Sequence, residues 1–236
     1  MTATFLPRQR RSAAEPLAIE ALVFDMDGLL LDTERLAFRA LQQAGAELGL
    51  EMPESLCHSM IGVAADKSRL LLLERHGDAA PADALFAAAA RHLEAQVEAG
   101  LLDVKAGVPE LLSAAEQAGL PKAVATSSAR QKALRHLHAA GIDGRFDAIV
   151  TRDDVERGKP HPDLFLRAAA ALGTAPERCL ALEDSYNGVR AAHAAGMPVV
   201  MVPDLLAPSE EMHRLCRAVL TDLHAVLPLL GRGGDR

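Results

Sequence analysis

Two aspartates, Asp25 and Asp27, stand one residue apart directly after the apolar run Ile19 to Phe24, and Gly28 follows them. The apolar run predicts a buried strand, and the glycine predicts a turn at its end. Carboxylates that leave a strand in this way can attack an electrophile, transfer a proton or bind a divalent cation. Aspartate and glycine are also common turn residues, so a solvated turn is the alternative.

Polar groups also follow the ends of later apolar runs. In an open parallel sheet, ligands bind beyond the carboxyl ends of the strands, where side chains from different strands meet. We therefore expect these polar groups to converge on one rim of a sheet. Besides the first two aspartates, they are Thr126-Ser127-Ser128, Lys159 and Glu183-Asp184-Ser185.

The two acidic pairs, Asp25 with Asp27 and Glu183 with Asp184, predict a magnesium site. A carboxylate can approach a phosphate dianion only where cations offset the repulsion between them. Mg²⁺ takes hard oxygen ligands, and the candidates are the carboxylates of Asp25 and Asp184, the backbone carbonyl of Asp27 and the carboxylate of Glu183. The set is therefore typical of phosphoryl transfer, in which the protein positions the substrate and stabilises charge.

The remaining groups are suited to hold a phosphoryl group. Lys159 would supply a fixed positive charge, and Thr126 and Ser127 would donate hydrogen bonds beside backbone N–H groups at a helix start. Each has a simpler explanation, because hydroxyls and acidic residues commonly cap helices and a lysine before a proline can be a solvated loop residue. One shared site explains all of them more simply than independent roles do.

Strand-like runs alternate with helical stretches along most of the chain, which predicts parallel pairing and a doubly wound α/β sheet. The runs are mostly apolar, as expected for a sheet that is covered on both faces. They are Ile19 to Asp25, Lys122 to Thr126, Phe146 to Val150, Cys179 to Glu183, Pro198 to Val202 and Ala218 to Thr221.

One long stretch breaks this alternation. From Leu36 to Leu102 the pattern is helical, which predicts an all-helical unit inserted after the first strand. We therefore expect residues 17–35 and 103–236 to form an α/β catalytic core and residues 36–102 to form a cap. Residues 1–16 contain three arginines without a following apolar segment, and we expect a flexible leader there.

Composition narrows the class of protein. The net charge is −7, and the chain has no Trp and a single Tyr, which argues against nucleic-acid binding. No apolar run approaches the length of a membrane span. The three cysteines are widely spaced, which favours a reducing cytoplasm. We expect a cytoplasmic monomer or weak dimer whose partner is a small phosphorylated metabolite.

Four motifs give the chain a family resemblance. It resembles the haloacid dehalogenase superfamily, in particular the β-phosphoglucomutase-like phosphatases with a small helical cap. This resemblance implies a Rossmann-like core, and it extends from about Ile19 to Thr221. The matching segments are FDMDGLLLDTE at 24–34, ATSS at 125–128, GKPHPD at 158–163 and LEDSYNGV at 182–189.

The resemblance implies a role for each group. Asp25 attacks the phosphoryl group and forms an aspartyl-phosphate, while Asp27 protonates the leaving oxygen and then activates water. Thr126 and Lys159 bind the transferring phosphoryl group. Asp184 binds Mg²⁺ together with Asp25 and the backbone of Asp27, and Glu183 contributes directly or through water. The cap excludes water and selects the leaving group.

Residues in the cap help to distinguish hydrolysis from a mutase reaction. The mutases of this branch carry a histidine where this chain has Ala37, and an arginine soon after a Gly-Val pair that is followed here by alanines at 64 and 65. Hydrolysis is therefore preferred to a phosphosugar mutase reaction. A binding protein without activity is a further alternative, disfavoured by the intact acidic residues. Candidate substrate contacts are Lys67, Arg69 and Asn187, although Lys67 and Arg69 also fit a solvated helix face.

Overall fold

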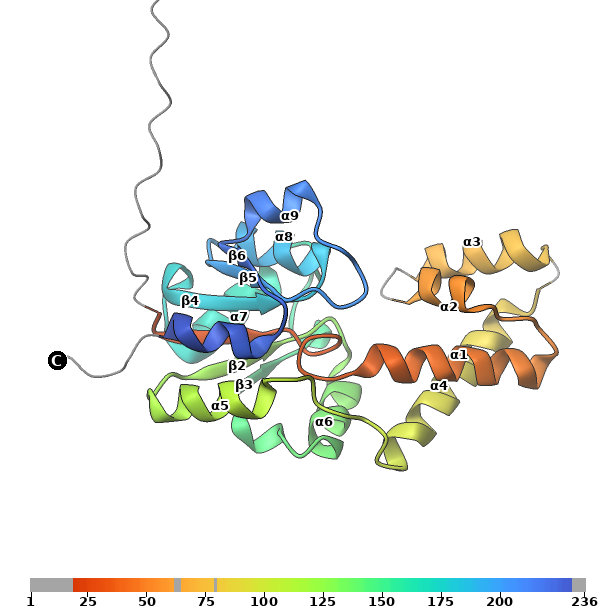
Figure 1. The fold of residues 1–236 in the computed structure, drawn as a ribbon, viewed down its shortest axis with the longest axis horizontal. Helices are drawn as coiled ribbons and strands as arrows, with labels where there is room; N and C mark the ends of the chain where they lie inside the picture. Colours follow the sequence, from red (N-terminus) through yellow and green to blue (C-terminus); the bar gives the residue numbers. More distant parts are fainter. Residues whose placement is uncertain (1–18, 62–64, 79, 231–236) are drawn as a thin grey trace, which may run out of the picture.

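The computed structural model describes residues 19–61, 65–78 and 80–230, and these residues contain a six-stranded sheet in the order β3-β2-β1-β4-β5-β6 (Figure 1). All neighbouring strands are parallel. This arrangement confirms the predicted doubly wound α/β fold. The strands are β1 (Ala21–Phe24), β2 (Lys122–Ala125), β3 (Ala148–Val150), β4 (Cys179–Glu183), β5 (Val199–Met201) and β6 (Ala218–Val219).

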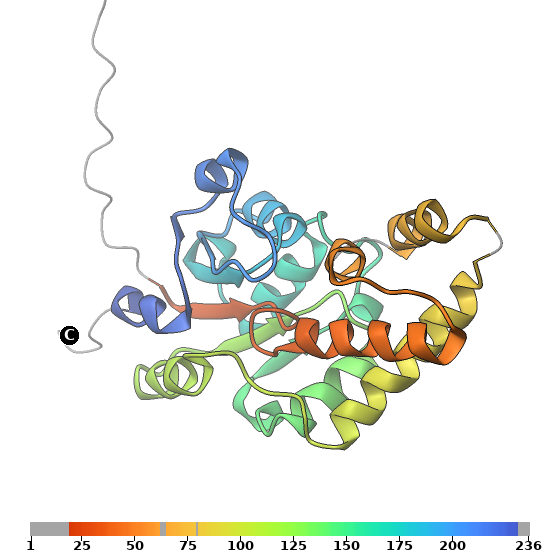
Figure 2. The same ribbon diagram turned by 45° about the vertical axis from the view of Figure 1, so that its right-hand side comes forward.

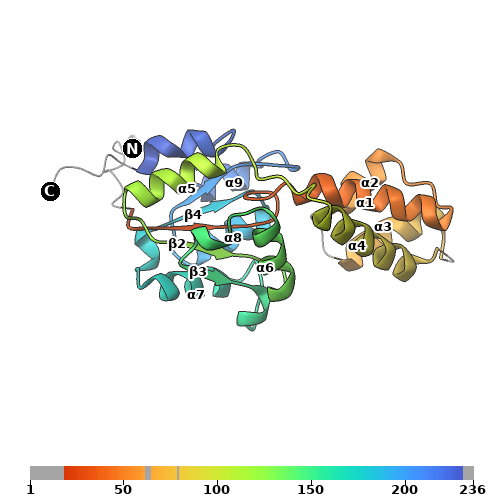
Figure 3. The same ribbon diagram turned by 90° about the horizontal axis from the view of Figure 1, so that it is seen from below.

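Helices cover both faces of the sheet because alternate strand residues point to opposite sides. Leu22 and Phe24 pack in one hydrophobic cluster with α5 (Val108–Gln117), α6 (Arg130–Ala139) and η4 (Leu223–Leu230). Ala21 and Val23 pack in a second cluster with α7 (Asp163–Leu172), α8 (Tyr186–Ala194) and α9 (Glu210–Leu215). Figure 3 shows α5 and α7 on opposite sides of the sheet. Short 3-10 turns are η1 (Asp143–Arg145), η2 (Arg152–Asp154) and η3 (Pro176–Arg178).

The predicted helical insertion after the first strand is confirmed. It comprises α1 (Thr33–Leu48), α2 (Glu54–Met60), α3 (Ala65–His76) and α4 (Ala82–Glu98). These helices have their own hydrophobic cluster, which includes Leu41, Ala44, Leu72 and Leu85. The cap lies beyond the carboxyl end of β1, with α1 and α4 side by side (Figures 1 and 2). Helix α1 begins before Leu36, and Leu36 itself packs in a core cluster, so the domain boundary at 35/36 stays a prediction.

Strands β1, β2, β5 and β6 end one or two residues earlier than their predicted runs, whereas β3 and β4 end where their runs end. Asp25 and Thr126 lie just beyond β1 and β2, and not inside them. Their backbone N–H groups still donate to the neighbouring strands, at 3.0 Å to Leu182 O and 3.0 Å to Val150 O. The backbone is therefore fixed by the sheet while the side chains are free to face the rim.

No helix in the described part of the chain combines the length and apolar character needed to cross a membrane. The predicted leader at 1–16, the Gly-Val pair at 62 and 63 and the last six residues lie outside the described residues.

Candidate active site

Most of the predicted site residues line one cavity of about 750 Å³ between the sheet and the cap, whereas Glu183 and Arg69 are not among its lining residues. The cap contributes apolar side chains to this cavity, among them Ala37, Ile61 and Leu93. The core contributes the polar side chains that the sequence singled out, namely Asp25, Asp27, Thr126, Ser127, Lys159, Asp184 and Asn187. Groups separated by more than 150 residues thus share one rim of the sheet, as expected for parallel strand ends.

The loop after β1 aims both aspartates at the cavity. Met26, between them, is fully buried in the core, and its carbonyl accepts hydrogen bonds from Leu30 and Leu31 at 3.0 Å each. Gly28 has a φ of 86°, a left-handed conformation that favours glycine. A Cβ on Gly28 would also overlap the carboxylate of Asp184. The glycine therefore lets the β1 loop approach the end of β4.

Lys159 lies between two carboxylates. Its ammonium donates to Asp25 Oδ1 and, at 2.5 Å, to Glu183 Oε1, and its side chain is 5% exposed. Burial alone would lower the pKa of Lys159, but the two carboxylates outweigh this effect and hold the pKa above its usual value. Lys159 is therefore a permanent positive charge beside Asp25.

Glu183 is committed to hydrogen bonds inside the protein. Its Oε2 accepts from the N–H groups of Asp184 and Ser185, each at 3.1 Å, and from the Ser185 hydroxyl at 3.0 Å. The side chain is fully buried, and the absence of a side chain at Gly188 leaves the space that its carboxylate fills. These contacts hold the Glu183 carboxylate in place, where it accepts a hydrogen bond from Lys159.

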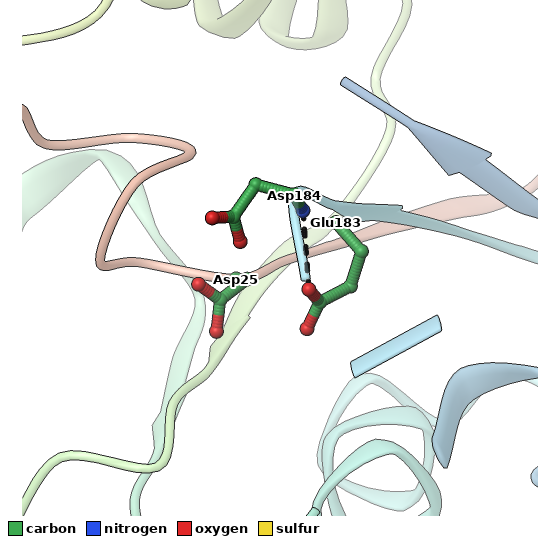
Figure 4. A group of neighbouring side chains, drawn as sticks. All are labelled: Asp25, Glu183 and Asp184. Carbon is green, nitrogen blue, oxygen red and sulfur yellow. Dashed lines mark hydrogen bonds between the residues drawn. The ribbon is translucent and has the colours of Figure 1, made fainter. Parts of the chain in front are cut away.

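Asp25 and Asp184 form the open part of the acidic cluster. Figure 4 shows their carboxylates facing each other, with the Glu183 carboxylate on the far side of the Asp184 backbone. Carboxylate oxygens of the three residues lie within 4.8 Å of one another. Asp184 Oδ1 is buried and has no hydrogen-bond partner in the described part of the chain.

The charge on this pair calls for a cation. Burial raises the pKa of Asp25 to about 8, with Lys159 opposing the rise and Glu183 adding to it. Burial, reinforced by Asp25 and Glu183, raises the pKa of Asp184 well above its ordinary value. Lys159 cannot neutralise three carboxylates. A hard divalent cation such as Mg²⁺ fits the all-oxygen donor set and the unpartnered oxygen of Asp184.

Asp27 is held by residues that the sequence analysis did not assign to it. The hydroxyl of Ser128 donates to Asp27 Oδ2 at 2.8 Å, and Lys132 Nζ lies 3.8 Å from Asp27 Oδ1. Ser128 lies in the loop before α6, and Lys132 lies in the first turn of that helix. Their direction toward Asp27 depends on how α6 leaves the sheet, which no local sequence pattern indicates.

The hydroxyl cluster precedes helix α6 and does not cap it. The N-cap position of α6 is occupied by Ala129, and no side chain makes a capping hydrogen bond. Thr126 is 1% exposed, and its Oγ1 accepts from the N–H of Ser128 at 3.0 Å. Its hydroxyl proton remains available to a ligand. Ser185, in contrast, does cap α8, because its Oγ accepts from Gly188 N at 3.1 Å.

The cap residues proposed as substrate contacts separate into two groups. Lys67 lines the cavity. Arg69 is not among the cavity-lining residues, and its guanidinium pairs with Asp83 of α4. Ala37, the position of the missing histidine, faces the cavity.

A further charged group near the rim was not anticipated. Glu34, in the first turn of α1, lines the cavity, and burial together with the neighbouring carboxyl group of Asp204 raises its pKa to about 8. Lys105 Nζ donates to Asp204 Oδ1 at 2.6 Å. The three residues link the two segments that enter and leave the cap to the loop after β5. No local sequence pattern brings them together.

Known proteins are similar to this chain in sequence and in fold. Residues 19–196 match the family model of haloacid dehalogenase-like hydrolases. The plasmid protein CbbY of Cupriavidus necator is 39% identical over 78% of this chain and 78% of its own length. A phosphorylated carbohydrates phosphatase of Thermotoga maritima is 33% identical over 76% of this chain and 82% of its own. A crystal structure of a CbbY mutant from Rhodobacter sphaeroides with xylulose-(1,5)bisphosphate has a TM-score of 0.70 and 30% identity, covering 87% of this chain and 95% of that chain.

The chain therefore belongs to the haloacid dehalogenase-like hydrolases. Within them it falls in the CbbY and β-phosphoglucomutase-like branch, which carries a helical cap. This confirms the family resemblance that the four sequence motifs carry.

Replacing Gly188 by alanine tests the anchoring role of Glu183. Alanine normally favours a helix over glycine by about 1 kcal/mol, but a Cβ here would overlap the Glu183 carboxylate. We expect Gly188→Ala to lower the free energy of unfolding by roughly 1–3 kcal/mol and hydrolase activity by about tenfold or more. Thermal denaturation and steady-state kinetics measure both. Gly144→Ala is the control, because a Cβ there meets nothing within 4 Å. Equal behaviour of the two variants would contradict the assignment.

Replacing Asp184 by asparagine tests the cation requirement. The change removes a buried carboxyl group whose ionised form the site disfavours, so the metal-free protein should gain free energy of unfolding on the order of 1 kcal/mol. Mg²⁺ should raise the melting temperature of the unmodified protein, because it binds the folded state, and this increase should vanish in Asp184→Asn. Thermal melts with EDTA and with Mg²⁺ provide the measurement. Asp66→Asn, at an exposed cap residue, is the control. A full Mg²⁺ response in Asp184→Asn would exclude Asp184 as a ligand.

Proposed function

We propose that the protein is a Mg²⁺-dependent phosphomonoester hydrolase that acts on a small phosphorylated metabolite, such as a sugar phosphate or a nucleotide-like phosphate. The observation that carries the proposal is the position of Asp25 between the Lys159 ammonium and the Asp184 carboxylate, whose Oδ1 has no hydrogen-bond partner among the described residues. A nucleophilic carboxylate needs positive charge on both sides before it can approach a phosphate dianion.

The residues of the chain then have distinct tasks. Asp25 attacks phosphorus and forms an aspartyl-phosphate as the leaving oxygen departs. Asp27, held by Ser128, gives the leaving oxygen a proton and later takes one from the water that hydrolyses the intermediate. Lys159 and the hydroxyl of Thr126 bind the phosphoryl oxygens, and Ser127 adds a further donor at the same wall of the cavity.

The metal would be held by the carboxylates of Asp25 and Asp184 and the backbone carbonyl of Asp27. Glu183 is committed to Lys159 and to the turn after β4, which favours an indirect contribution from it. When bound, Mg²⁺ neutralises the carboxylate pair and the phosphoryl oxygens, so that the two anions can meet.

Hydrolysis is favoured over the transfer of a phosphoryl group within a sugar. Ala37 lines the cavity where the mutases of this branch carry a histidine, so this chain brings no imidazole to that point. The substrate class is supported by the relatives, of which one is named a phosphorylated carbohydrates phosphatase and another binds a sugar bisphosphate. Lys67 and Asn187 line the cavity and are candidate contacts to the leaving group. A cytoplasmic monomer or weak dimer stays a prediction.

Two substitutions test the chemistry together. Asp25→Asn removes the nucleophile, and we expect phosphate release from p-nitrophenyl phosphate to fall by several orders of magnitude. Asp27→Asn keeps the nucleophile but slows hydrolysis of the intermediate, so a covalent phosphoryl group should accumulate and be visible by intact-protein mass spectrometry.

Asp32→Asn, just beyond the catalytic loop, is the matched control for charge. Normal turnover by Asp25→Asn would overturn the assigned nucleophile. Isomerisation of a hexose 1-phosphate without release of phosphate, followed by phosphorus NMR, would replace hydrolysis by a mutase reaction.

A further inference from the structure

The cap contains a second hollow of about 380 Å³. It lies between α1 and α4, and the end of α2 and the start of α3 close it. Figure 2 shows α1 and α4 side by side. Alanines on both long helices leave this space open, because larger side chains at those positions would fill it. Among its walls are Ala37 and Ala40 of α1, and Ala89 and Ala90 of α4.

This hollow adjoins the active-site cavity. Ala37, Ile61 and Leu93 line both of them. A leaving group that reaches these three side chains from the phosphoryl end of the cavity would therefore meet the hollow in the cap.

The walls of the hollow are apolar. None of the described residues that line it is charged, and Ser68 is the one polar side chain among them. The hydroxyl of Ser68 is buried and donates to the carbonyl of Met60 at 2.9 Å, so its proton is already used. The Ser68 oxygen can still accept one hydrogen bond, so a sugar with several hydroxyls would lose most of its hydrogen bonds to water here, whereas an alkyl or aryl group would lose none.

We propose that this hollow binds an apolar portion of the substrate's leaving group. The inference rests on the proposed phosphomonoesterase function and narrows its substrate class to phosphomonoesters that carry an alkyl or aryl group beyond their polar part. The hollow is within the size range of small-molecule binding sites, which are typically about 300–1,000 Å³ and mostly apolar. Because the hollow is in the cap, an apolar group bound there would not contact Lys159 or Asp184, which line only the active-site cavity.

A series of non-hydrolysable alkylphosphonates tests this proposal without requiring turnover. Methyl-, propyl- and hexylphosphonate share one anionic head and differ only in apolar length. With Mg²⁺ present, isothermal titration calorimetry should show affinity rising roughly threefold to fourfold for each methylene until the hollow is filled. Equal affinities for methyl- and hexylphosphonate would overturn the proposal.

A pair of matched variants locates the effect. Ala89 lines the hollow, whereas Ala87 is exposed on the same helix and does not line it. Leucine is close to alanine in helix propensity, so both Ala89→Leu and Ala87→Leu should fold. We expect Ala89→Leu to cut the hexyl-to-methyl affinity ratio by about tenfold, because its side chain occupies the hollow, and Ala87→Leu to leave the ratio unchanged. The same ratio in both variants would place the alkyl chain elsewhere and overturn the proposal.

These measurements distinguish an error in the apolar hollow from an error in the phosphoryl site. If methylphosphonate binds and esters are hydrolysed without any dependence on chain length, the proposed function stands and the apolar subsite is wrong. If no phosphonate binds and no ester is hydrolysed, the phosphoryl site itself is wrong and the subsite falls with it.

Discussion

The contact between the Lys159 ammonium and the carboxylates of Asp25 and Glu183 governs the rest of the site. Ionised groups are costly to bury unless they are paired, and here three carboxylates share a buried space with one lysine. Glu183 uses the lysine as its partner and is further satisfied by the turn after β4. Asp25 and Asp184 are left with more negative charge than the protein neutralises, which is the electrostatic basis for a bound cation.

The sheet makes this arrangement possible. Each charged group follows the end of a strand or its connecting loop, and the strands fix the backbone on which the side chain sits. Asp25, the proposed nucleophile, donates its backbone N–H to Leu182 O of β4, which holds it beside Glu183 and Asp184. Gly28 lets the β1 loop approach the carboxylate of Asp184, and Gly188 leaves the space that the Glu183 carboxylate fills. The cap then adds apolar walls opposite a charged floor, so one cavity presents both kinds of surface.

The sequence was sufficient for the sheet, the helical insertion and the meeting of distant groups at one rim, because strand periodicity and parallel topology determine them. It was not sufficient for contacts that depend on how helices leave the sheet or rotate within the cap. The approach of Lys132 to Asp27 depends on how α6 leaves the sheet. The pairing of Arg69 with Asp83, which removes a candidate substrate contact from the cavity, depends on how helices rotate within the cap. The sequence also did not predict the hydrogen bonds that hold Glu183 inside the protein, because they depend on the space left by Gly188.

A crystal structure of the protein grown with Mg²⁺ and a phosphate analogue such as tungstate tests the central claim most directly. The account predicts one metal ion bound by the carboxylates of Asp25 and Asp184, with the analogue beside Asp25 and in contact with Lys159. A metal bound elsewhere, or an analogue bound away from Asp25 while these carboxylates stay without a cation, would contradict it.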